Sequence, residues 1–295
     1  MMVAENSSTE PKRTYFPLWG RLFIQADLRL VTGLHIGGSP AGIEIGGMNN
    51  PIIRNPLNGQ PYLPGSSLRG KIRSLLEKYD NLPFNQRIQD IYIHGYDEKT
   101  GDMSEVCYIF GVHGNAPKAE PTRLFIRDVN QLFQLKSLDK FGADQQPVNG
   151  DYTEAGEESR VVEVKWEASI DRVTSAAVPR QQERISAGLV FRGAELVYNF
   201  YSAKDYERLA KVLLGMRLLE DDYLGGSGGR GSGKVAFEHL NFIARRAQSN
   251  DPNIYQQEQR KYYRDINQTL GDLANLRSWI EGQIPPVSVP TDAGN

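Results

Sequence analysis

Basic side chains gather at the expected start of a helix. Ser66 and Ser67 come just before Arg69, Lys71 and Arg73, and either serine could cap the helix. Free N–H groups at a helix N-terminus attract phosphate, and basic side chains in the first turns add counter-charge. This segment predicts a phosphate contact, although a capped surface helix with solvated charges accounts for it about as well.

A second candidate is the glycine-rich loop over residues 225–234, which holds six glycines. Glycine lets the backbone approach a ligand closely, and successive free N–H groups can form an anion-binding nest. Gly226, Gly228, Gly229 and Arg230 are therefore candidate phosphate-binding residues. A flexible loop whose glycines only satisfy turns is the competing interpretation.

The same loop nearly matches a nucleotide-binding P-loop, but two features exclude that interpretation. Val235 stands where a magnesium-binding Ser or Thr is required. A P-loop also runs from strand to helix, whereas here an expected helix precedes the loop and an expected strand follows it.

A third candidate comprises Ile170–Thr174 and Pro179–Arg184, between the alternating stretches 161–168 and 189–201. A segment that joins two expected strands in this way predicts a projecting hairpin. Its polar residues alone are more typical of an ordinary solvated loop than of a binding surface. The candidate contact residues here are Asp171, Arg172, Thr174, Arg180 and Gln181.

His35 sits in a Gly-rich turn, and a lone histidine is more often a hydrogen-bonded structural residue than a catalyst. The other three histidines lack metal-ligand spacing, and no Ser/His/Asp or Cys/His arrangement stands out. The single cysteine, Cys107, excludes intrachain disulfides and cysteine-rich zinc sites. No metal site is predicted.

The elements that must position these residues alternate in type. Apolar periodicities predict strand, helix, strand, then strand, helix, strand, the order of a split βαβ, ferredoxin-like α+β fold. A further amphipathic helix is expected within the C-terminal segment. The expected ranges are strands 21–31, 124–129, 161–168, 189–201 and 234–243, and helices from about 66 to 79, 204–220 and 253–281.

The formal net charge of −2 does not by itself suggest nucleic acid. The charges are unevenly placed, however. The stretch from Ile45 to Leu76 contains only basic charged residues, which are Arg54, Arg69, Lys71 and Arg73. Local positive potential of this kind can coexist with a neutral total.

Targeting signals are not visible in the sequence. No apolar run approaches the length of a membrane span, and no signal-peptide apolar region begins the chain. A cytoplasmic protein with no membrane partner is therefore expected.

Taken together in order, these segments resemble the backbone subunits of type III-A CRISPR effector complexes, in the RAMP superfamily. The similarity covers about residues 21–243. The segments that carry it are Gly33–Gly38, Asn50–Pro56, Pro64–Arg73, Ile109–Gly111, Arg127–Asp128, Ile170–Thr174, Ala177–Gln181 and Asp222–Phe237.

The resemblance implies a modified ferredoxin-like or RRM core, over residues 15–243, with an insertion at 80–105 and a thumb hairpin at 161–187. It leaves a disordered arm at 1–14 and a C-terminal helical extension at 244–295. The implied partners are CRISPR RNA, target RNA, further copies of the chain or related subunits, a polymerase-like signalling subunit and a small helical subunit. His35, Arg54 and the helix and glycine-loop candidates would contact the guide, and the hairpin candidates would lie near the target.

One departure from the family concerns catalysis. The family cuts target RNA with an aspartate shortly after the Gly-Gly turn, and that position is Pro40 here. Proline can neither hold a hydrated magnesium ion nor accept a proton, and Glu44 is the nearest carboxylate. We expect weak or absent cleavage, no tightly bound cofactor, and a need for Mg²⁺ only if cleavage is retained.

A RAMP endoribonuclease that matures CRISPR RNA is the alternative function. It would share the glycine loop and use His35 as a general acid or base. The thumb-like segment at 161–187 argues against it, because such nucleases act alone and need no thumb.

Overall fold

A computed structural model describes residues 16–38, 50–112, 116, 119–135, 152–154, 161–247 and 257–287. The disordered arm expected at residues 1–14, Pro40, Glu44 and most of the segment 136–160 lie outside the described residues.

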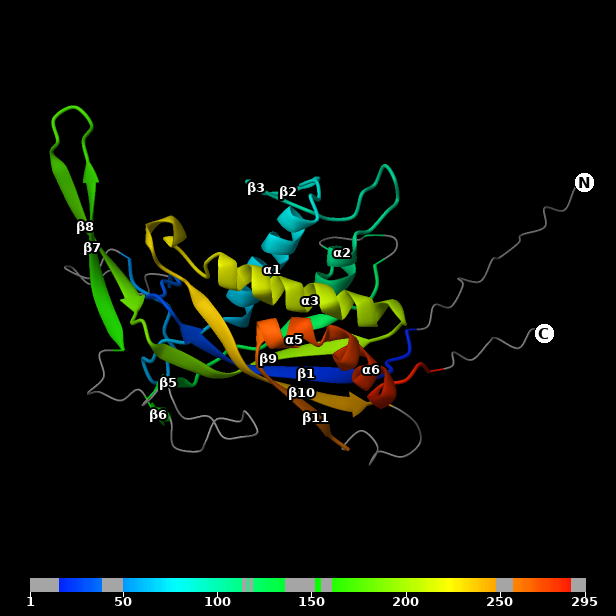
Figure 1. The fold of residues 1–295 in the computed structure, drawn as a ribbon. Coiled ribbons are helices and arrows are strands. Elements are labelled where there is room, and N and C mark those ends of the chain that lie inside the picture. The colour runs from blue at the N-terminus through cyan, green and yellow to red at the C-terminus, as the bar shows by residue number, and fades with distance from the viewer. Residues whose placement is uncertain are drawn as a thin grey trace, which may run out of the picture.

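A seven-stranded sheet forms the centre of the fold (Figure 1). Its strand order is β11-β10-β1-β9-β5-β6, with β4 also pairing with β9, and every pairing is antiparallel. Alternation in β1 buries Leu22, Ile24 and Leu28 on one face, as expected for a strand whose other face is more open. The strands are β1 (Gly20–Leu30), β4 (Leu124–Ile126), β5 (Leu132–Leu135), β6 (Tyr152–Glu154), β9 (Leu189–Phe200), β10 (Val235–Arg246) and β11 (Gln259–Asp265).

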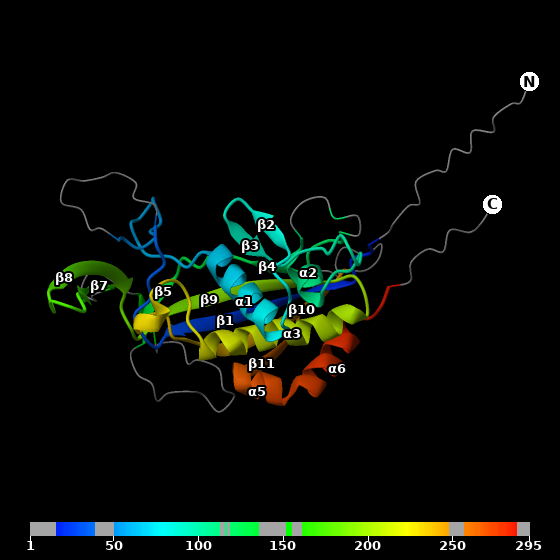
Figure 2. The same ribbon diagram turned by 90° about the horizontal axis from the view of Figure 1, so that it is seen from above.

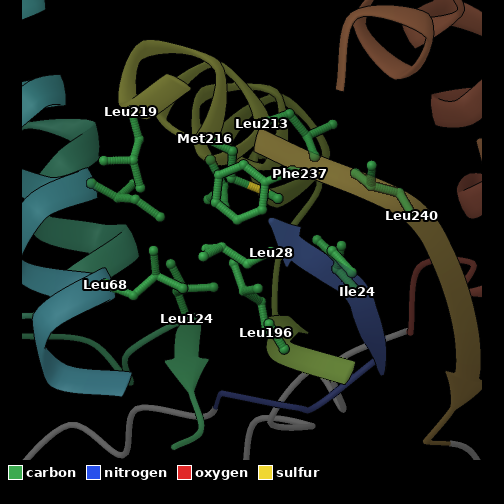
Figure 3. Close-up of a cluster of buried hydrophobic side chains, with 14 of the residues drawn as sticks. Ile24, Leu28, Leu68, Leu124, Leu196, Leu213, Met216, Leu219, Phe237 and Leu240 are labelled. Carbon is green, nitrogen blue, oxygen red and sulfur yellow. The ribbon is translucent and has the colours of Figure 1, made fainter. Parts of the chain in front are cut away.

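Helices cover one face of this sheet and close the core (Figures 1 and 3). Leu28 of the sheet, Leu68 of α1 and Leu213 of α3 are fully buried together. Burying each such side chain contributes roughly 1.5–3 kcal/mol, so this layer holds α1 and α3 firmly on the sheet. The helices are α1 (Gly65–Tyr79), α2 (Glu105–Phe110), α3 (Lys204–Asp221), α5 (Ile266–Gly271), α6 (Leu273–Gln283) and the 3-10 turn η1 (Gly228–Arg230).

The core elements follow the expected order. β1, α1 and β4 are followed by β9, α3 and β10, which is strand, helix, strand twice over. The predicted α+β class is therefore confirmed.

Two hairpins extend from this core. One pairs β7 (Val162–Ile170) with β8 (Ala177–Ile185), lies within residues 161–187, and projects from one end of the sheet (Figures 1 and 2). The other pairs β2 (Gln86–Ile88) with β3 (Ile91–Ile93), within the segment 80–105. The larger hairpin carries the residues predicted to lie near the target.

The start of α1 differs from the prediction. Pro64 occupies the N-cap position and makes no side-chain cap hydrogen bond, so neither Ser66 nor Ser67 is the N-cap residue. The Gly65 N–H instead donates to Asp128 Oδ1 at 2.7 Å. A carboxylate from a distant loop suits this place because the helix N-terminus is electropositive.

The C-terminal segment also differs. The prediction of a helix over 253–281, in a helical extension at 244–295, was wrong for residues 259–265, which form β11 beside β10. Tyr263 is buried there, packed edge-on against Phe242. The apolar residues whose spacing suggested one helix face therefore lie in three elements, the strand β11 and the short helices α5 and α6. The helices within the described ranges are all too short or too polar to span a lipid bilayer.

Candidate nucleic-acid interface

A single carboxylate joins the β7–β8 hairpin to the glycine loop. Glu167 Oε2 lies 2.9 Å from Arg230 Nε and 3.0 Å from Arg180 Nη2, and Glu167 Oε1 lies 3.6 Å from Lys165 Nζ. Lys165 Nζ also donates to the Arg230 carbonyl at 2.5 Å. Three cations share one carboxylate, so this junction keeps an excess of two positive charges.

The arginines of this junction remain accessible. The side chains of Arg180 and Arg230 are 48% and 52% exposed, whereas that of Glu167 is 8% exposed. A guanidinium has five N–H donors in a planar fork, so one ion pair leaves donors that can reach a phosphate. The arrangement is chemically suited to binding a polyanion.

The pKa of Glu167 is consistent with this charge balance. Desolvation opposes ionisation of the carboxyl, but the hydrogen bond from Arg180 and the charges of Arg230 and Lys165 outweigh it and lower the pKa below its usual value of 4.5. Glu167 therefore stays ionised at neutral pH and keeps its cations in place.

A second contact fixes the start of the loop. Gln182 Nε2 donates to Ser227 Oγ at 2.7 Å, and Ser227 Oγ is 3.0 Å from Gln182 Oε1. Arg230 Nη2 donates to the same hydroxyl oxygen at 2.8 Å. Ser227 has a left-handed backbone with φ of 62°, so these bonds hold a conformation that serine rarely adopts.

Glu183, the neighbouring residue in β8, ties the hairpin to the N-terminal half of the chain. Its Oε2 accepts from the Ile52 N–H at 2.8 Å, and its Oε1 pairs with the Arg54 guanidinium. Its backbone carbonyl lies 2.7 Å from His35 Nδ1. The residues that flank the segment 39–49 are thus held against the base of the hairpin.

His35 is buried beneath the glycine loop rather than exposed on it. The residue is 6% exposed, and its Nδ1 must donate because the Glu183 carbonyl can only accept. Its own carbonyl accepts from the Gly226 N–H at 2.8 Å. A Cβ on Gly226 would lie 3.2 Å from the His35 ring. These contacts favour a role for His35 in positioning the loop.

The glycines of the loop have different surroundings. A Cβ on Gly228 would lie 2.0 Å from the Tyr223 ring, whereas one on Gly229 would meet nothing within 4 Å. Lys71 of α1 completes this packing: its Nζ lies 3.7 Å from the centroid of the Tyr223 ring and 2.9 Å from Asp222 Oδ2. Gly228 leaves room for an aromatic ring, and Gly229 leaves open backbone.

The basic residues of α1 divide into two groups. Arg69 donates to the Phe110 carbonyl, and Arg73 donates to the carbonyls of Gly111 (3.1 Å) and His94 (2.8 Å). Both therefore hold the end of α2, while Lys71 contacts Asp222 and Tyr223, just before the glycine loop. The three candidates predicted together from sequence do not share one side of the helix.

The tip of the β7–β8 hairpin is a compact turn. Asp171 Oδ1 accepts from the N–H groups of Val173 (2.8 Å) and Thr174 (2.7 Å). Both hydrogen bonds lower the pKa of the Asp171 carboxyl, and the bond from Thr174 has the larger effect. Arg172 is exposed beside the turn, and Gln181 pairs across the hairpin with Trp166.

The described residues contain no group of three or more His, Cys, Asp or Glu side chains able to hold a metal ion. Pro40 and Glu44, the two positions that the sequence links to magnesium, lie outside those residues.

Sequence reasoning missed several residues that build this surface. Glu167, Gln182 and Ser227 make its central contacts, and Asp128 holds the start of α1. Asp128 and Ser227 lie in segments that carry the family resemblance, and Glu183 is the one acid among four arginines over residues 172–192. The other partners are too far apart in sequence for any local pattern to reveal.

Comparison with known proteins supports the same interpretation. The family model of the RAMP superfamily matches residues 27–236. The chain is 34% identical over 262 residues to "CRISPR system Cms endoribonuclease Csm3" of Methanocaldococcus jannaschii, covering 88% of this chain and 95% of that protein. It is 39% identical to the protein of that name from Methanothermobacter thermautotrophicus, covering 74% and 83%.

Two solved structures are similar along most of their length. One is a Csm3–Csm4 subcomplex of the type III-A CRISPR-Cas interference complex, with 27% identity, a TM-score of 0.52, and coverage of 88% of this chain and 97% of that chain. The other is Csm3 of Methanopyrus kandleri, with 20% identity and a TM-score of 0.54, covering 91% and 99%, which shows the shared fold.

Proposed function

The chain belongs to the RAMP superfamily, as a Csm3-like protein of the type III-A CRISPR backbone, and we propose that it binds CRISPR RNA at the junction between the β7–β8 hairpin and the glycine loop. The observation that carries this proposal is the cluster of Lys165, Arg180 and Arg230 around Glu167. Its excess positive charge lies beside the open backbone of Gly229.

This surface suits an RNA whose sequence varies. Guanidinium, ammonium and backbone N–H groups contact phosphates, and phosphate contacts carry no sequence information. A subunit that must accept any guide needs this kind of contact. The projecting β7–β8 hairpin would lie near the target strand, with Asp171, Arg172 and Thr174 at its tip.

Further subunits complete the proposed assembly. Copies of this chain would stack along the guide, and a subunit related to the Csm4 of the similar subcomplex would bind beside one of them. A polymerase-like signalling subunit and a small helical subunit are proposed as the other partners, with target RNA bound by pairing to the guide.

Among the functions of the family, cleavage of target RNA is the one that the residues of this chain support least. The curated relatives bear the name endoribonuclease, but Pro40 stands where the family resemblance places the aspartate. We propose that the chain binds target RNA and cuts it poorly, with magnesium required only for whatever cutting is retained.

Purified protein distinguishes the backbone function from processing of precursor RNA. A backbone subunit is expected to co-purify with RNA, or to form filaments on added guide RNA, and to leave repeat RNA intact. A small species that cuts repeat RNA alone would contradict the proposal, and loss of that cutting in His35→Ala would identify a processing nuclease.

A further inference from the structure

Two β-bulges flank one acidic residue on the sheet face that turns away from α1 and α3. Asp27 is a residue of β1. Strand β1 lies between β9 and β10 in the sheet (Figure 1). The pairing of β1 with β9 shifts between Ala26 and Leu28, and its pairing with β10 shifts between Gln25 and Asp27. Bulges re-aim side chains and are frequent beside functional sites.

Both bulges direct polar groups at Asp27. The Gly193 N–H donates to Oδ1 at 3.2 Å, and His239 Nδ1 lies 3.1 Å from Oδ2. Arg192 Nε is 3.9 Å from the same oxygen. His239 has a φ of 53°, a left-handed conformation that costs energy for a residue with a side chain. The strained backbone of His239 therefore places its ring beside the carboxylate of Asp27, a residue that is 6% exposed.

These irregularities border a pocket of about 390 Å³, a size found for small-molecule sites. Three amide side chains line it, from Gln25, Gln131 and Asn241. Arg260 Nη2 pairs with Glu258 Oε2 at 2.8 Å, as Arg192 pairs with Asp27, but the two arginine side chains are 47% and 34% exposed, so each keeps N–H donors for a phosphate. The pocket also holds an aromatic ring, Tyr262, which is 42% exposed.

The lining selects a ligand by its chemistry. An apolar ligand would cover these polar side chains without pairing with them. A divalent cation would find one carboxylate, Asp27, among the lining residues and two arginines nearby. A neutral sugar would use the amides and Tyr262 but neither arginine. A nucleotide would use the aromatic ring, the amides and the arginines together. A base stacks on an aromatic ring, amides bind base edges, and guanidinium groups bind phosphate.

We propose that this pocket binds a nucleotide, with the base on Tyr262 and against the amides, and the phosphate at Arg192 and Arg260. The site lies on the open face of the sheet, so it is separate from the guide surface at the hairpin. Its occupant is either a free nucleotide or an unpaired nucleotide of an RNA strand, since both present the same groups.

Calorimetric titration of the full chain, freed of nucleic acid, with AMP tests the proposal. AMP is expected to bind, and Tyr262→Ala is expected to weaken binding about tenfold through loss of stacking. Gln131→Ala, at an exposed position, should also weaken it. Absence of AMP binding at millimolar concentration overturns the proposal, as does equal binding of ribose 5-phosphate, which lacks a base.

A matched control and a second probe complete the design. Tyr92→Ala removes another exposed tyrosine, from β3, and should leave AMP affinity unchanged. Equal weakening by Tyr92→Ala and Tyr262→Ala, with unchanged melting temperatures, would contradict a site at Tyr262. The second probe is an adenine hexanucleotide. If it binds more tightly than AMP and loses affinity in Tyr262→Ala, the occupant of the site is an RNA strand. If its affinity equals that of AMP, the occupant is a free nucleotide.

Discussion

Glu167 of β7 and Arg230 of the glycine loop form an ion pair with Oε2 and Nε 2.9 Å apart, across 63 residues of sequence. The pair orients the loop against the projecting hairpin, so the two proposed RNA-contacting segments are parts of one surface. Because Glu167 also binds Arg180 and Lys165, it sets the spacing of all three cations at this junction.

Removing the charge of Glu167 should loosen the loop without unfolding the protein. In Glu167→Gln we expect faster amide hydrogen exchange over residues 226–232, since Arg230 loses its ionic partner. Global stability should change by no more than about 1 kcal/mol, because partly exposed ion pairs contribute little. Glu163→Gln is the control, because Glu163 pairs with Arg184 on the same hairpin rather than with the loop. Faster exchange in both variants, or in neither, would contradict the proposed coupling.

Substitutions of two adjacent glycines should have different effects. Gly229→Val places its side chain in open space and should leave the melting temperature unchanged while weakening guide RNA binding, since it obstructs the backbone. Gly228→Val would displace the Tyr223 ring and should lower the melting temperature. Filter binding and thermal melting measure the two effects. Wild-type RNA affinity in Gly229→Val would leave the loop with only a structural role.

Basic residues of the junction and of α1 should also separate by their salt dependence. Arg230→Ala should lower the slope of log affinity against log salt concentration by roughly 0.7, the value for one phosphate contact to a single strand. Arg73→Ala should instead lower the free energy of unfolding by about 1–3 kcal/mol, because Glu77 and two carbonyls lose their donor. Binding at several salt concentrations and chemical denaturation provide the measurements. An unchanged slope in Arg230→Ala would remove that residue from the interface.

Local patterns in the sequence predicted the core well. The helix expected at 204–220 is α3, Lys204–Asp221, and the strand expected at 189–201 is β9, Leu189–Phe200. Both segments have an apolar periodicity that matches their burial. Residues 259–265 were assigned to the wrong element, because Tyr262, Ile266 and Leu270 fit a helix face although the strand β10 beside them provides an edge for pairing.

Long-range partners could not be predicted in this way. Glu183 looked like an isolated acid, and only the fold brings its carboxylate to Arg54 and the Ile52 N–H. Arg69, Lys71 and Arg73 looked like one basic cluster, yet the helix turns Lys71 away from the other two. Sequence indicated which segments matter, whereas the partner of each side chain depends on tertiary packing.

Cutting of target RNA should be restored by one substitution. Pro40 lacks any polar side-chain atom, so it cannot assist removal of the 2′-hydroxyl proton or hold a hydrated magnesium ion. We expect the assembled complex with magnesium and labelled target to give little product, and Pro40→Asp to give regularly spaced fragments. Regular fragments from the unmodified chain that disappear in Glu44→Ala would contradict the expectation and identify Glu44 as the substitute carboxylate.

Mass measurement of complexes formed on guide RNAs of increasing length tests the central claim most directly. A backbone subunit that stacks along RNA should add one chain, 33.1 kDa, each time the guide grows by a fixed number of nucleotides. Arg230→Ala should form these species only at lower salt concentration. One chain per RNA at every length, with no regular increment of mass, would contradict the proposed function.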